Sequence, residues 1–106
     1  MTVVCRLDVL QPNRGVAALL PDGSQVAVFR TGDGEVFALS NVDPYSGAAV
    51  LSRGIVGDRH GVQVAVSPVY KQAFDLRTGV CLDDPTVSVR TYPVRVDGGV
   101  IVVGLA

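Results

Sequence analysis

Short apolar runs with two-residue alternation occupy much of the chain, and each run ends at a turn. Residues 16–20 are apolar, residues 21–24 (PDGS) carry a strong turn signal, and residues 25–31 (QVAVFRT) form the next run. A second turn at residues 31–34 (TGDG) leads into residues 35–39 (EVFAL). Because each connection is too short for a crossover helix, these runs predict an antiparallel meander.

Two more hairpins are predicted further along the chain. Residues 92–96 (YPVRV) and 100–103 (VIVV) flank an Asp-Gly-Gly turn, and residues 70–76 and 80–82 flank an Arg-Thr-Gly turn. No segment sustains a three-four periodicity over the 10–12 residues that indicate a helix. The pattern therefore predicts an all-β fold, a small sandwich or barrel of antiparallel strands.

One long stretch, residues 41–61, fits neither period. Residues 48–53 have the length of a single helical turn, but Gly47 and Gly54 bracket them and short isolated helices are marginal. A long irregular loop in a small domain is more often functional than filler. We therefore expect the functional part of the chain here.

Length and charge narrow the function classes. The chain has 106 residues, which predicts a single domain over residues 1–106, and 48% hydrophobic residues supply a core. Nine Lys+Arg against ten Asp+Glu give no basic excess, so we expect no nucleic-acid partner. No apolar stretch reaches a membrane span and the first residues do not resemble a signal peptide, so we expect no membrane association and a cytoplasmic protein.

The residues with chemical potential do not form a recognisable catalytic or metal set. Cys5 and Cys81 are two isolated cysteines, which are most often small buried hydrophobes in a reducing compartment. The single histidine, His60, lies between glycines and charges and is expected in an exposed loop. Asp83 and Asp84 are adjacent, a spacing typical of a solvated turn. We therefore predict no catalytic residue and no metal ligand.

Residues 67–79 (SPVYKQAFDLRTG) resemble the second cluster-binding loop of Rieske ferredoxin domains, commonly C-P-x-H-G-x-x-F-D-L-x-T-G. The first Rieske loop, C-x-H, corresponds to Asn41-Val42-Asp43 here. The resemblance implies a Rieske-like fold whose ligand positions are Asn41, Asp43, Ser67 and Tyr70. A Rieske cluster takes two cysteine thiolates and two imidazoles, and none of these four residues supplies either. We therefore expect no iron–sulfur cluster and no other cofactor in this chain.

The stretches NVDPYSGAAVLSRGIVGD, SPVYKQAFDLRTG and CLDDP…V…YPVRV are similar to the small subunit of bacterial NAD(P)H-dependent assimilatory nitrite reductase. The resemblance covers about residues 41–96. It implies a non-catalytic accessory subunit that partners a large subunit carrying siroheme, a [4Fe–4S] cluster and FAD, which reduces nitrite to ammonium in nitrate assimilation. Two alternatives stay open: a stand-alone Rieske-like binding or regulatory module of another redox complex, and an electron-transfer ferredoxin with unorthodox ligands.

Two hypotheses concern the residues of the loops. The first is that Asn41, Asp43, Ser67 and Tyr70 form a hydrogen-bonded substitute for the cluster, against the alternative that these positions simply drifted once iron was lost. The second is that exposed loop residues with Arg and Tyr contact the large subunit. The predicted interface residues are Pro44, Tyr45, Arg53, Asp58, Arg59 and Lys71.

Overall fold

Turn chemistry fixes the first sheet, in which strands β2, β3 and β4 follow one another as a meander. The computed structural model describes residues 1–104, so the last two residues of the predicted 1–106 domain lie outside the described part. Gly23 at φ 89° and Gly34 at φ 90° occupy the two turns, in a backbone conformation that glycine adopts without steric cost. A fourth short strand, β8, pairs with β4 and completes the order β2-β3-β4-β8. The strands are β2 (Arg14–Leu19), β3 (Gln25–Arg30), β4 (Val36–Ser40) and β8 (Thr91–Tyr92).

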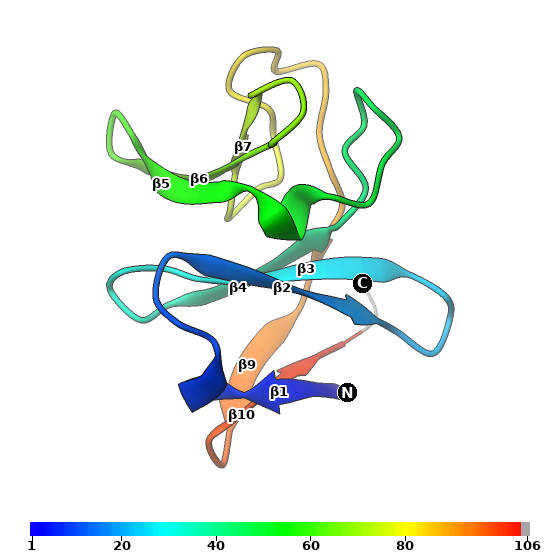
Figure 1. Ribbon diagram of the computed structural model, residues 1–106, viewed down its shortest axis with the longest axis vertical. Helices are drawn as coiled ribbons and strands as arrows, with labels where there is room; N and C mark the ends of the chain where they lie inside the picture. Colours follow the sequence, from blue (N-terminus) through cyan, green and yellow to red (C-terminus); the bar gives the residue numbers. More distant parts are fainter. Residues whose placement is uncertain (105–106) are drawn as a thin grey trace.

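Two three-stranded antiparallel sheets cover the two faces of this central sheet (Figure 1). One has the order β1-β10-β9 and the other the order β5-β6-β7. The strands of the first are β1 (Thr2–Arg6), β9 (Val94–Asp97) and β10 (Val100–Val103). Those of the second are β5 (Ile55–Arg59), β6 (Val62–Val66) and β7 (Ala73–Asp75). The all-β, antiparallel prediction is confirmed.

The helical content of the described chain consists of two 3-10 turns, η1 (Leu7–Val9) and η2 (Leu51–Arg53). The second falls within the segment where the sequence has room for one helical turn. Within residues 1–104 no helix is long and apolar enough to cross a membrane.

The structure differs from the predicted pattern in the middle of the chain. Residues 55–59, expected to be irregular, form β5 and pair with β6 across a turn at His60 and Gly61, whose φ angles are 54° and 83°. The irregular part is therefore shorter than residues 41–61. The hairpin predicted over residues 70–82 begins later than expected, since β7 starts at Ala73. Its two arms do pair, through an antiparallel bridge between Phe74 and Cys81.

The central strand β3 is buried on both faces, which gives the molecule two hydrophobic clusters. Ala27 and Phe29 face the β5-β6-β7 layer, while Val26 and Val28 face the β1-β10-β9 layer. This division follows from the alternation of side chains along a strand. The loops that follow β4 and β6 leave the layered core at the same end of the molecule, at the top of Figure 1.

Candidate functional site

Two loops meet at this end, and we call them the first loop (residues 41–50, between β4 and η2) and the second loop (residues 67–72, between β6 and β7). They contain the four positions that the resemblance equates with Rieske ligands. We call the hydrophobic cluster between the central sheet and the β5-β6-β7 sheet the upper cluster. The β4–β8 and β5-β6-β7 pairings bring the starts of both loops onto this upper cluster. Residues 82–88 form a third loop at the same end (Figure 1).

Asn41 is buried and holds the two ends of the first loop together. Its side-chain amide donates to the carbonyl oxygen of Ala49 at 3.3 Å, and its side-chain oxygen accepts the backbone N–H of Ser52 at 2.7 Å. Its backbone carbonyl accepts the N–H of Leu51 at 3.1 Å. All of these bonds lie within the first loop and the start of η2, so Asn41 does not reach the second loop.

Asp43 and Ser67 join the two loops directly. Both residues are completely buried, and the Ser67 hydroxyl donates to Asp43 Oδ2 at 2.5 Å. Asp43 Oδ1 also accepts the N–H of Tyr45 at 2.8 Å, and Ser67 Oγ accepts the N–H of Val69 at 3.2 Å. Each side chain therefore organises its own loop and bonds to the other, across 24 residues of sequence.

Tyr70 is the fourth ligand-equivalent residue and lies apart from the other three. It is 58% exposed at the outer side of the second loop. A turn fixes this loop: the N–H of Lys71, at φ 64°, donates to the Ser67 carbonyl at 3.1 Å, and Lys71 Nζ donates to the Pro68 carbonyl at 3.1 Å. The hydrogen-bonded contact between the loops thus involves Asp43 and Ser67, while Tyr70 faces solvent.

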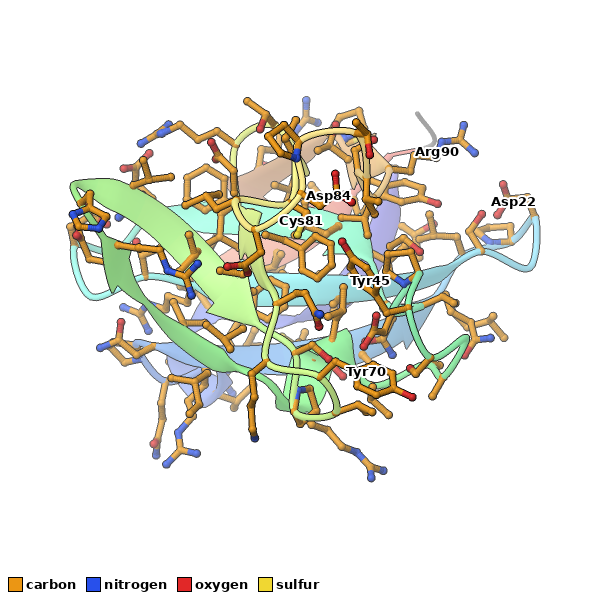
Figure 2. The ribbon with its side chains drawn as sticks, turned by 90° about the horizontal axis from the view of Figure 1, so that it is seen from above. Asp22, Tyr45, Tyr70, Cys81, Asp84 and Arg90 are labelled. Carbon is orange, nitrogen blue, oxygen red and sulfur yellow. The ribbon has the colours of Figure 1, made fainter. Side chains whose placement is uncertain are left out.

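Tyr45 lies over the upper core with its hydroxyl directed at Cys81 (Figure 2). The hydroxyl donates to Cys81 Sγ at 3.5 Å, and the ring centroid is 6.4 Å from that of Phe74. The hydrogen bond to Cys81, aided by burial, raises the pKa of Tyr45 to about 12. The hydrogen bond to Cys81 and the contact with Phe74 hold the Tyr45 ring against the core.

The donors at the four equivalent positions do not fit a Rieske cluster. They are an amide, a carboxylate, an aliphatic hydroxyl and a phenol, where the cluster takes two thiolates and two imidazoles. Two of them are already bonded to each other at 2.5 Å. In the described part of the chain no three His, Cys, Asp or Glu side chains gather closely enough to hold a metal ion.

The structure brings some of the predicted interface residues together and separates others. Pro44, Tyr45 and Lys71 are exposed on the two loops. Arg53 is exposed at the end of η2; the next residue, Gly54, packs against the Val66 carbonyl just before the second loop.

Asp58 and Arg59 lie at the opposite end of the β5–β6 hairpin from the second loop. Ile55 at the start of β5 pairs with Val66, whereas Arg59 at its end pairs with Val62. Asp58 accepts the N–H of Gly61 and belongs to the hairpin turn. Arg59 forms an ion pair with Asp83 at 2.9 Å. The Asp83 carboxyl also accepts the N–H of Ala73, and this bond is the main cause that lowers its pKa.

Sequence reasoning missed Val69, which is 44% exposed between Pro68 and Tyr70. The available signal was the run Ser-Pro-Val-Tyr itself, in which an apolar residue follows proline in a loop. The resemblance to the Rieske loop concerns Ser67 and Tyr70, and Val69 falls between these two positions.

Comparison with known proteins agrees with this arrangement. The Rieske-like [2Fe-2S] domain family matches residues 1–104. The chain is 43% identical over 99 residues to the nitrite reductase (NADH) small subunit of Escherichia coli K12, covering 92% of this chain and 91% of that one. The chain belongs to this Rieske-like small-subunit family.

Two other relatives extend the comparison. The crystal structure of a Mycobacterium tuberculosis protein assigned as an NADH-dependent nitrite reductase small subunit superposes on this Rieske-like chain with a TM-score of 0.95. The two are 60% identical, over 99% of this chain and 95% of that one. The nitrite reductase [NAD(P)H] large subunit of Klebsiella oxytoca contains a segment 44% identical to this chain over 101 residues. The match covers 95% of this chain and 10% of that protein.

Proposed function

We propose that this chain is the small accessory subunit of an NAD(P)H-dependent nitrite reductase that reduces nitrite to ammonium in the cytoplasm during nitrate assimilation. In this proposal the large subunit holds the siroheme, the [4Fe–4S] cluster and FAD, and carries out the chemistry. The small subunit holds no cluster and is inactive alone.

The observation that carries the proposal is the Klebsiella large subunit, in which a homologous segment is part of the large-subunit polypeptide itself. Covalent linkage keeps two domains together at high effective concentration, which is useful where they work in contact. A separate small subunit can achieve the same association through a non-covalent interface. The full-length similarity to a small subunit in E. coli supports this role for a free chain.

The ligand positions support the absence of a cluster. Replacing iron ligands by Asp43 and Ser67 leaves the two loops joined by a buried hydrogen bond, so the Rieske-like frame keeps a link between its loops without metal. The chain's own chemistry at this end then consists of positioning the loops.

Co-expression with the nitrite reductase large subunit of the same organism tests the proposal. The two chains should co-elute on size exclusion, and the complex should oxidise NAD(P)H with nitrite while the isolated chain is inactive. Purified alone, the chain should contain no iron or acid-labile sulfide. About two iron atoms per chain would favour the electron-transfer ferredoxin alternative, and co-elution with a different reductase instead would favour the stand-alone module.

A further inference from the structure

The exposed aromatic side chains of the protein are concentrated on the two loops. Of its three tyrosines and three phenylalanines, Tyr45 and Tyr70 are the ones exposed by more than a third, at 36% and 58%. Val69, at 44%, precedes Tyr70 on the second loop, and Pro44 and Pro68 are also exposed. We call these five residues the tip surface. Figure 2 looks down on this end and shows Tyr45 and Tyr70 on neighbouring loops.

The tip surface is held in place from below. The Ser67–Asp43 bond joins the two loops, and each of the two side chains also accepts a backbone N–H from the loop residue two positions on. Tyr45 is further fixed by its bond to Cys81. A surface ordered before binding loses less conformational entropy on association, so it is better suited to a stable contact than a mobile loop.

Two cations flank the tip surface. Arg53 and Lys71 are exposed, and neither forms an ion pair within the described residues. An apolar, aromatic centre with charged residues around it is the common composition of a protein–protein interface. Asp84 of the third loop also lies near Tyr45, so the edge of the tip surface carries both signs of charge.

We infer that the tip surface is the docking site for the nitrite reductase large subunit, on a region of that subunit that is apolar at its centre and charged at its edge. This inference rests on the proposed function, because the Klebsiella fusion is what identifies the large subunit as the occupant. Asp58, which accepts the N–H of Gly61 at the far end of the β5–β6 hairpin, lies outside this docking site. The Arg59 side chain instead pairs with Asp83, whose carboxyl also accepts the N–H of Ala73 directly after the second loop.

A matched pair of valines tests the location of the interface. Val69 is 44% exposed on the second loop, and Val96 is 42% exposed on β9, at the opposite end of the molecule. Val69→Asp, Val96→Asp and Tyr70→Ala are each titrated against the purified large subunit by calorimetry, after thermal unfolding shows that each variant folds. Val69→Asp and Tyr70→Ala should weaken binding about thirtyfold, as loss of a central interface residue does, and Val96→Asp should leave it within about threefold.

Every outcome decides a specific point. Wild-type binding that is unaffected by Val69→Asp and Tyr70→Ala overturns the docking site, and loss through Val96→Asp alone moves it to the β1-β10-β9 sheet. Failure of the wild-type chain to bind refutes the proposed function itself. Self-association of the isolated chain that Tyr70→Ala abolishes would make the tip surface a contact between copies of this chain and overturn the assignment of the occupant.

Discussion

Removing the Ser67 hydroxyl should destabilise the protein by about 2 kcal/mol. The hydroxyl donates to a carboxylate at 2.5 Å, and both residues are completely buried. A hydrogen bond to a charged group contributes about 1.5–3 kcal/mol, and a buried acceptor left without its donor costs a similar amount. Ser67→Ala creates this situation, because Asp43 Oδ2 loses its one protein donor among the described residues and water cannot reach it without opening the loops.

Thermal unfolding followed by circular dichroism measures the effect. Unfolding entropy scales with chain length, and for 106 residues a loss of about 2 kcal/mol lowers the midpoint by roughly 9 °C. Hydrogen exchange then localises the change, because Ser67 Oγ also accepts the N–H of Val69. The Val69 amide should exchange faster in Ser67→Ala, while amides in the β9–β10 hairpin keep their protection.

Two comparisons can refute this reasoning. Ser88→Ala removes an exposed serine hydroxyl and should change stability by less than about 0.5 kcal/mol. Asp43→Ala combined with Ser67→Ala should destabilise less than the sum of the single variants, since removing both partners leaves no unpaired acceptor. If Ser67→Ala unfolds within about 1 °C of Ser88→Ala, or the two single effects simply add, the bond does not hold the loops together.

Two further predictions concern a glycine and a carboxylate. Gly79→Ala should cost about 3 kcal/mol, because its φ is +77° and a Cβ would lie 2.1 Å from the Val89 carbonyl oxygen. Gly98→Ala, at φ +58° with open space around it, should cost only about 1 kcal/mol. Urea unfolding of both variants measures the two losses of stability, and their difference is the cost of the steric clash at Gly79 beyond that of the backbone conformation. The hydrogen bond from the Ala73 N–H is the largest cause that lowers the pKa of Asp83. The ionised carboxylate therefore stabilises the fold fully above the ordinary carboxyl pKa of about 4. This stabilisation is lost as the pH falls through the lowered pKa of Asp83. Asp83→Asn should therefore unfold at lower temperature than wild type at pH 7, and the gap should close towards pH 3; a constant gap would contradict this role.

The parts of the fold that the sequence predicted well are those with strong turn chemistry. Gly23 and Gly34 lie in turns that the residues PDGS and TGDG indicate clearly, and the Asp-Gly-Gly turn indicates the last hairpin. The β5–β6 hairpin was harder because its turn is His60-Gly61, and histidine is a less obvious residue than asparagine for a position at positive φ. Gly57 inside β5 also weakens the strand signal.

The sequence does not show which of the residues predicted at the interface lie on one surface. The sequence places Asp58 and Arg59 in the same expected irregular stretch as the first loop, and it gives no sign that a strand carries their backbone away from that loop. The register of β5 against β6 sets that separation, since Ile55 rather than Arg59 pairs next to the second loop. Local composition describes exposure, whereas the pairing of strands decides which exposed residues share a surface.

The Asp43–Ser67 bond depends on long-range strand pairing too, and it joins the two loops in the cluster-free chain that we propose. A Rieske cluster joins its two loops by coordination bonds to side chains of both. Without a cluster, the polar side chains at these buried positions need hydrogen-bond partners. A carboxylate and a hydroxyl at the matched positions satisfy each other with one bond, and each keeps a backbone N–H partner in its own loop. The same two side chains fix the positions of Tyr45 and Val69, which lie two residues after Asp43 and Ser67. The link between the loops and the shape of the exposed surface above it are thus determined by the same pair of side chains, so a change in Asp43 or Ser67 should weaken docking through the loops without touching the partner.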